Sequence, residues 1–163
     1  MSEAELLRFM EQRREQTKKR QQMNKALRSV MTPLLRQHAF TGTCPRFRRL
    51  GQERYDLLMI QFNKGDDSFL IEIGQCTLDW YRRERGAYHP PEKLISWSLP
   101  LYQRARIQPQ PGPGTEDCFQ YGDAKTQDDY KRIAESVVPF MNRAVEMLDD
   151  FEHVEKLGED RRA

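Results

Sequence analysis

The sequence predicts an α+β fold: an antiparallel four- to five-stranded meander sheet flanked by a long N-terminal and a long C-terminal helix, both packed on one face. Three observations support this prediction. Apolar residues recur with helical spacing near both ends of the 163-residue chain, segments of period two lie between them, and short turns join those segments. Alternating segments joined by short turns form antiparallel sheets, and helices that flank such a sheet cover one of its faces.

The N-terminal helix is expected from Glu3 to His38, a stretch without glycine. Its second half carries one apolar stripe, formed by Met23, Leu27, Val30, Met31, Leu34 and Leu35. Residues 11–22 contain no apolar side chain, so this part of the helix has no surface to bury. Pro33 lacks a backbone donor, which predicts a kink or a restart of the helix with Thr32 as its cap.

The strands are expected between residues 46 and 121. The strongest are 55–62 and its return at 69–74, joined by a turn in which Gly65 supplies the reversal. Shorter strands are expected at residues 46–50, 102–107 and 118–121. Together these segments predict a meander.

Residues 79–99 are rich in aromatic residues, arginine and proline. We expect a long loop there, with one helical turn at 91–95 that begins at a proline. The terminal helix begins after Thr126, which is the expected cap, and is expected to bend at Pro139. Its apolar stripe comprises Tyr130, Ile133, Val137, Phe140, Met141, Ala144, Val145, Leu148 and Phe151.

The chain divides into a polar helical extension at residues 1–22, a single domain at 23–157 and a disordered tail at 158–163. Twelve Lys and Arg face four Glu in the first 49 residues, so they carry +8, and the remainder carries −6 of the overall +2. The opposite signs suggest that the basic N-terminal helix pairs with the acidic C-terminal one; solvated faces, or a separate partner for each end, are the alternatives.

Composition excludes several classes of protein. No stretch approaches the roughly 18 consecutive apolar residues of a membrane span, and no apolar segment resembles a signal peptide, so we expect a cytoplasmic protein. Cys44, Cys76 and Cys118 form no Cys-x-x-Cys pair and are expected to be isolated thiols. The three histidines lack metal-ligand spacing. We therefore predict no metal, no cofactor and no catalytic residue, and lean against an enzyme.

Several local strings occur together in one known family. They lie at residues 33–40, 47–49, 60–63, 69–74, 104–107 and 138–140. Through them the chain, over roughly residues 20–150, resembles a bacterial family known as domain of unknown function 4304. It departs from that family at Ala39, where Gly is usual, and at Glu72, where Asn is commoner. The resemblance supports the fold but implies no activity; immunity proteins that neutralise a toxin are an analogy at fold level.

One candidate site lies on the predicted sheet. Neighbouring strands can present Gln61, Glu72, Arg104 and Arg106 on one face. Carboxylate and guanidinium groups arranged in this way form a specific recognition surface. An ordinary cross-strand salt bridge on a solvated face is the alternative interpretation.

A second candidate site is the aromatic segment that follows the sheet strands. It combines Trp80, Tyr81, Arg83, Tyr88 and Trp97. Aromatic residues and arginine are enriched at the hot spots of protein interfaces, and loops commonly carry such sites. Packing of the two tryptophans over the end of the core would explain the same composition.

These observations predict a non-enzymatic module with a protein partner, plausibly an immunity or inhibitor protein. The alternatives are an uncharacterised small-molecule-binding protein and a nucleic-acid-associated protein, although the near-zero net charge disfavours the latter. A nucleic-acid surface would use the basic residues of the N-terminal helix, namely Arg13, Arg14, Lys18, Lys19 and Arg20. The oligomeric state stays open, since this helix could also pair with a copy of itself.

Overall fold

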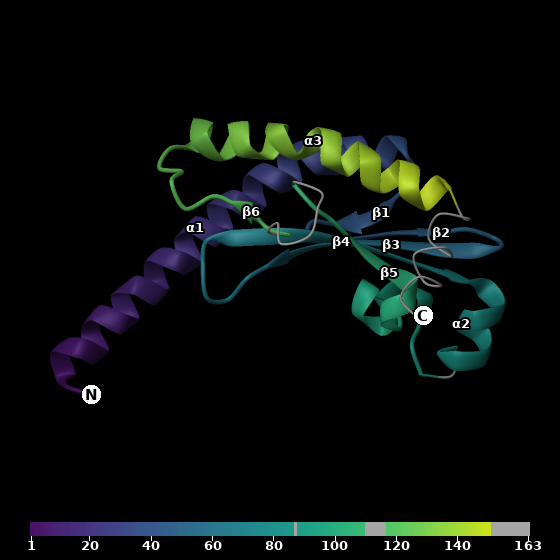
Figure 1. Cartoon of the computed structure of the whole chain (residues 1–163), viewed down its shortest axis with the longest axis horizontal. Coiled ribbons are helices and arrows are strands. Elements are labelled where there is room, and N and C mark those ends of the chain that lie inside the picture. The colour runs from purple at the N-terminus through teal and green to yellow at the C-terminus, as the bar shows by residue number, and fades with distance from the viewer. Residues whose placement is uncertain (87, 110–116, 151–163) are drawn as a thin grey trace.

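A layer of two long helices covers one face of an antiparallel sheet (Figure 1). The structure, a computed structural model, describes residues 1–86, 88–109 and 117–150. The long helices are α1 (Glu3–Gln37) and α3 (Gln127–Asp149), and a short helix, α2 (Leu78–Glu84), lies on the opposite side of the sheet. The predicted α+β architecture, with both long helices on one face, is confirmed.

Six strands form the sheet within the described part of the chain. They are β1 (Thr41–Thr43), β2 (Arg46–Leu50), β3 (Arg54–Phe62), β4 (Ser68–Thr77), β5 (Arg104–Ile107) and β6 (Phe119–Gln120). The order β1-β2-β3-β4-β5, with antiparallel neighbours throughout, confirms the meander. β6 pairs with the start of β4. The sequence did not reveal β1, because three residues without an apolar side chain show no alternation.

Helix α1 is a single helix, so the predicted restart at Thr32 is wrong. It continues through Pro33 because Met31 and Leu35, on either side of the proline, are both fully buried and hold the backbone against the domain. The hydroxyl of Thr32 caps nothing; it is buried without a hydrogen-bond partner among the described residues.

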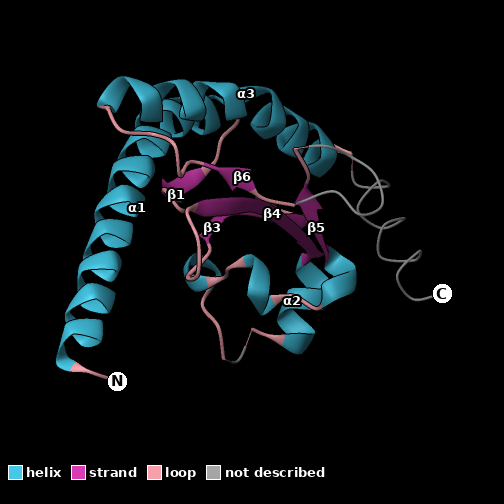
Figure 2. Cartoon of the chain, turned by 60° about the vertical axis from the view of Figure 1, so that its left-hand side comes forward, coloured by secondary structure: helices cyan, strands magenta, loops and turns pink. Residues whose placement is uncertain are grey.

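The first half of α1 extends past the sheet (Figure 1, Figure 2). Met23 is the first buried residue of the helix, as expected from the polar run before it. Lys19 is the point at which this half is tied to the domain, because its ammonium group lies 3.4 Å from Asp67 and donates to the carbonyl oxygen of Gly122 at 3.0 Å.

Helix α3 begins at its predicted cap, where the hydroxyl of Thr126 accepts from the backbone of Asp129, and continues through Pro139. It runs in the same direction as α1, which places its acidic end far from the basic start of α1 (Figure 1). The pairing of the two ends is therefore wrong for the described residues: Asp149 instead contacts Arg49 at 2.7 Å. Phe151 and the predicted tail at 158–163 lie outside the described residues.

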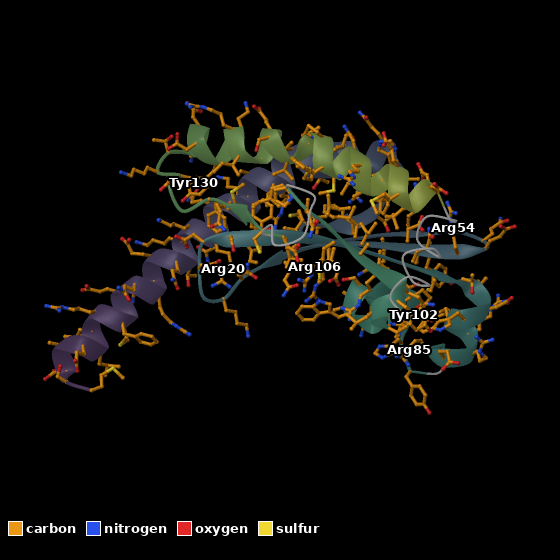
Figure 3. All side chains as sticks on the ribbon, viewed as in Figure 1. Arg20, Arg54, Arg85, Tyr102, Arg106 and Tyr130 are labelled. Atoms are coloured by element: carbon orange, nitrogen blue, oxygen red, sulfur yellow. The ribbon has the colours of Figure 1, made fainter. Side chains whose placement is uncertain are left out.

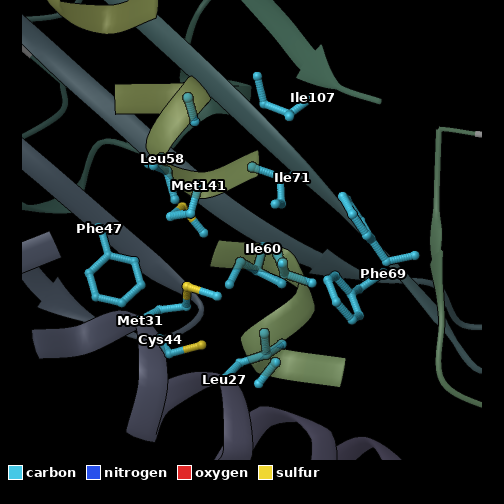
Figure 4. Close-up of a cluster of buried hydrophobic side chains, with 14 of the residues drawn as sticks. Leu27, Met31, Cys44, Phe47, Leu58, Ile60, Phe69, Ile71, Ile107 and Met141 are labelled. Atoms are coloured by element: carbon cyan, nitrogen blue, oxygen red, sulfur yellow. The ribbon is translucent and has the colours of Figure 1, made fainter. Parts of the chain in front are cut away.

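The main core fills the space between the two long helices and the sheet (Figure 4). Met23, Leu27, Met31 and Leu35 of α1 meet Val137 and other residues of α3 above the sheet. Alternate residues of the central strands complete it from below, among them Leu58, Ile60, Phe69, Ile71 and Ile73. The period-two pattern predicts this arrangement, because successive side chains of a strand point to opposite faces of the sheet.

A second, smaller core lies on the opposite sheet face. It comprises Tyr55, Leu57, Cys76, Tyr81, Leu94 and Leu99. Three short 3-10 helices, Pro91–Lys93, Ser96–Ser98 and Leu101–Gln103, cover this face together with α2. The predicted long loop, residues 79–99, is thus wrong for residues 79–84, which belong to α2. The sequence signal for α2 was Thr77, whose hydroxyl accepts from the backbone of Trp80 as a helix cap.

The three cysteines are free, as predicted. Cys44 belongs to the main core and Cys76 to the smaller one. Burial raises the pKa of each of these two thiols to about 12, which keeps them protonated and unreactive near neutral pH.

We expect the two halves of α1 to contribute very differently to stability. Leu27→Ala removes a side chain that is 0 % exposed and should lower the free energy of unfolding by about 2–5 kcal/mol. Leu7→Ala, the matched control on the extending half, removes a side chain that is 55 % exposed and should change it by at most about 0.5 kcal/mol. Urea unfolding measures both values, and equal losses would contradict this division of the helix.

Candidate functional site

The strand register brings the predicted polar residues together. Glu72 of β4 lies opposite Arg106 of β5, and the next residue on the same face, Gly74, lies opposite Arg104. Because side chains alternate along a strand, these groups all point away from α1 and α3. Figure 3 shows Arg106 on that side of the sheet. The expectation that both arginines share a face with Glu72 is confirmed.

The carboxylate of Glu72 is the centre of this group. The residue is only 4 % exposed. Its Oε1 accepts from the Ser96 hydroxyl at 2.8 Å and from Nη1 of Arg104 at 3.2 Å, and its Oε2 lies 3.6 Å from Nε of Arg106. The cross-strand salt bridge of the alternative interpretation is thus present, but its carboxylate is buried and not solvated. A buried charge of this kind persists only with such partners.

A cavity of about 660 Å³ opens beside this carboxylate. We call it the β5 groove, because consecutive residues of β5 form its floor. Its lining comprises Gln61, Glu72, Trp97, Leu101, Arg104, Ala105, Arg106, Ile107, Gln108, Asp117, Arg143 and Met147. Ala105 and Ile107 belong to the main-core face and the two arginines of β5 to the other, so the groove extends to both sides of the strand.

The groove carries more positive than negative charge. Three arginines, Arg104, Arg106 and Arg143, face two carboxylates, Glu72 and Asp117. Asp117 accepts from Gln108 and from Arg106, the latter at 3.1 Å, and these contacts lower the pKa of its carboxyl group. Both carboxylates are thus engaged by groups of the groove itself, which leaves a net positive surface at neutral pH.

Two groove side chains differ in the kind of hydrogen-bonding group that they carry. Arg106 is 48 % exposed although it contacts both carboxylates. Gln61, half-buried at the inner end, has a buried carbonyl oxygen that receives no hydrogen bond from the described residues. A guanidinium that offers donors and an amide that offers an acceptor fit a ligand with both a carboxylate and an N–H group.

The predicted aromatic surface does not form as one patch. Tyr81 is buried, packs its ring against Tyr55 at 5.0 Å and donates its hydroxyl to the carbonyl oxygen of His89 at 2.6 Å. Its assignment to a partner surface is therefore wrong. Trp80 is half-buried and stacks with the guanidinium of Arg85 at 5.6 Å. The packing interpretation holds for these two residues.

The other three members of that predicted surface separate from one another. Trp97 is 54 % exposed and lines the β5 groove, so it joins the site around Glu72. Tyr88 is 83 % exposed, Arg83 is also exposed, and neither lines the groove. Spacing along the chain could not distinguish these residues, because α2 and the 3-10 helices that hold Arg83 and Trp97 are too short to show a periodic pattern.

The basic residues of α1 do not contribute to the groove. Arg13 lies over the ring of Phe9 at 5.3 Å, and Lys19 is engaged with Asp67. Arg14 and Lys18 are exposed on the extending half of the helix, whereas Arg20 is half-buried. These residues therefore form a separate basic segment.

Sequence reasoning missed the contribution of α3. Arg143 and Met147 line the groove from the other side of β5. A network of buried polar groups holds this end of α3: Gln75 donates to the carbonyl oxygen of Leu148 at 2.7 Å and to Asp56 at 2.6 Å. A helical periodicity shows which face of α3 is polar, but it does not show which strand that face adjoins.

Within residues 1–86, 88–109 and 117–150, no three His, Cys, Asp or Glu side chains gather in a way that could hold a metal ion. None of the helices described over those ranges has the length and apolar character needed to cross a bilayer.

The fold and groove together define an α+β meander protein with an arginine-lined cavity beside its edge strand. The chain belongs to the family described as "Domain of unknown function (DUF4304)", whose model matches residues 31–150. The match begins within the buried half of α1, later than the resemblance from residue 20, so the extending half lies outside it. No curated protein and no solved structure matches the chain.

We expect Glu72 to be the most sensitive polar position of the site. Glu72→Ala leaves two guanidinium groups without their buried carboxylate and should lower the free energy of unfolding by about 3–5 kcal/mol. Asp117→Ala removes a partly exposed carboxylate from the same arginine and should lower it by at most about 1 kcal/mol. Chemical denaturation of both variants measures the difference, which should vanish if Glu72 is in effect solvated.

Proposed function

We propose that this protein is a cytoplasmic, non-enzymatic binding module that holds an acidic segment of a partner protein in the β5 groove. The observation that carries this proposal is the arrangement around Glu72. One buried carboxylate orients two arginines toward a cavity that also contains Arg143 and the half-exposed Trp97.

The orientation of the arginines supports recognition of a carboxylate. Guanidinium groups bind carboxylates in a bidentate geometry, with donors in a fixed plane. Arg104 is only 16 % exposed and is held by Glu72, so little side-chain freedom is lost when a ligand binds. Arg106 and Arg143 are more exposed and can adjust to the ligand.

The remaining lining supports a peptide as the ligand. Trp97 offers a large apolar surface beside the arginines, and Trp and Arg are the residue types that dominate protein-binding hot spots. The carbonyl oxygen of Gln61 offers an acceptor to a backbone N–H. A cavity that combines an acceptor, an aromatic ring and guanidinium groups fits an extended acidic peptide better than a simple anion.

A binding role is favoured over catalysis by the residue types of the groove. General acid–base and nucleophilic catalysis use chiefly His, Cys, Ser or carboxyl groups with access to substrate. The described lining holds no His, Cys or Ser, and both of its carboxylates are bound to arginine or glutamine. As the biological role we propose neutralisation of the partner, in the manner of an immunity protein or inhibitor, which needs only occupation of a surface.

We expect substitutions in the groove, and not at exposed residues outside it, to abolish partner binding. Trp97→Ala and Arg106→Glu should each weaken affinity by about thirtyfold or more, the level of a hot spot. Tyr88→Ala and Arg83→Glu are matched controls, since both residues are exposed and lie outside the groove. The partner is captured on the tagged full chain and its affinity for each variant is measured by calorimetry. Capture that persists in the two groove variants would refute the proposal.

A second candidate is nucleic-acid binding by α1, favoured by the exposure of Arg14 and Lys18 beyond the domain. This reading predicts an affinity for duplex DNA or RNA that falls steeply with salt and is lost in the variant Arg13→Gln/Arg14→Gln/Lys18→Gln. Trp97→Ala should leave it unchanged. Gel-shift titrations at two salt concentrations measure the affinity for duplex DNA or RNA. An affinity that does not change with salt would exclude the basic half of α1 as the nucleic-acid contact.

A further inference from the structure

The last two turns of α3 contribute side chains to the β5 groove. Arg143 and Met147, in the last two turns of α3, line the groove. The end of the helix is fixed over β4 and β2, because the carbonyl oxygen of Leu148 accepts from Gln75 of β4 and the carboxylate of Asp149 lies 2.7 Å from Arg49 of β2. The following residues therefore have to turn back toward β5 to reach the groove. Residue 151 is therefore four positions from a groove residue.

The chain has enough length to reach along the groove. Residues 151–163 follow α3, and an extended chain spans at most roughly 3.5 Å for each residue. The floor of the groove is the four-residue strand β5. Fewer than half of the following residues would be needed to run along it.

The composition of these residues complements the groove. Residues 151–160 hold four acidic side chains, Glu152, Glu155, Glu159 and Asp160, against one basic side chain, Lys156. Arg161 and Arg162 follow, so the acidic excess is confined to residues 151–160. Apolar residues recur among them at every third position, as Phe151, Val154 and Leu157.

The groove offers the opposite charge together with an apolar surface. Arg106 and Arg143 are exposed, and Trp97, also exposed, lies with them in the lining. Acidic and apolar residues in alternation are what such a lining can bind, by charge-assisted hydrogen bonds and by burial of the indole ring.

We propose that residues 151–160 of the same chain occupy the β5 groove when no partner is bound. This deepens the proposed function, on which it rests for the assignment of the groove to acidic segments. The segment then acts as an internal competitor: a partner must displace it, and the apparent affinity for the partner is reduced by the fraction of molecules in which the groove is filled.

A spin label on the full chain tests the docking directly. The label is attached to Gly158→Cys in a Cys118→Ser background, since Cys44 and Cys76 are buried and unreactive. We expect broadening of the Trp97 indole signal and of the β5 amide signals in nitrogen-15 spectra. Amides of residues 11–15, on the extending half of α1, serve as the remote control. Absence of broadening at β5 would overturn the proposal.

Two further samples identify the occupant. Glu152→Lys/Glu155→Lys in the labelled chain should abolish the broadening, because the charge complementarity is reversed. A mixture of spin-labelled chain without nitrogen-15 and unlabelled nitrogen-15 chain should show no broadening. Broadening in the mixture that matches the single-chain sample would assign the groove to a second copy and overturn the same-chain proposal.

The two proposals fail in different ways. If the docking is correct, Glu152→Gln/Glu155→Gln/Glu159→Gln should bind the partner more tightly than the natural chain. If groove variants leave partner binding unchanged while the spin label still broadens β5, the proposed function fails and the docking stands. If partner binding depends on the groove but the label broadens nothing, only the docking fails.

Discussion

The buried carboxylate of Glu72 sets the arrangement of the sheet face that looks away from the long helices. A charge at such a position is strongly unfavourable unless donors surround it. The fold supplies these donors from two different parts of the chain: Ser96 from a 3-10 helix, and Arg104 and Arg106 from β5. The contact with Ser96 also positions the neighbouring Trp97. The shape and charge of the groove therefore follow from the satisfaction of one side chain.

The two faces of the sheet serve different purposes. The face under α1 and α3 carries the larger of the two apolar cores. The other face carries a small core beneath α2 and the polar groove beside it, and the two meet at Gly74. A Cβ atom at Gly74 would lie only 2.9 Å from Cδ1 of Leu99, so glycine there allows the covering segment to approach the sheet closely. This close approach brings Ser96 within reach of Glu72.

Sequence reasoning succeeded where a residue's neighbours follow from local periodicity. The alternation of residues 55–62 and 69–74 predicted the two central strands, and the antiparallel pairing predicted that Glu72 would face the arginines of β5. It failed for α2, where Tyr81 and Arg83 lie two positions apart in one short helix but differ completely in exposure. Aromatic residues serve equally well in a core and at an interface, so composition alone could not separate the two.

By itself, the sequence determined the α+β class, the meander, the stripes that α1 and α3 bury and the face shared by Glu72 and the arginines. Only the tertiary structure decided that Trp97 belongs to the groove and Tyr88 does not. It also decided that Arg143 of α3 lines the groove beside β5, and that Glu72 is buried. The physical reason is that a sequence pattern reports on neighbours within one helix or strand, but not on contacts between distant segments. Periodicity within a strand or helix shows which way a side chain points, whereas burial depends on which distant segment packs against it.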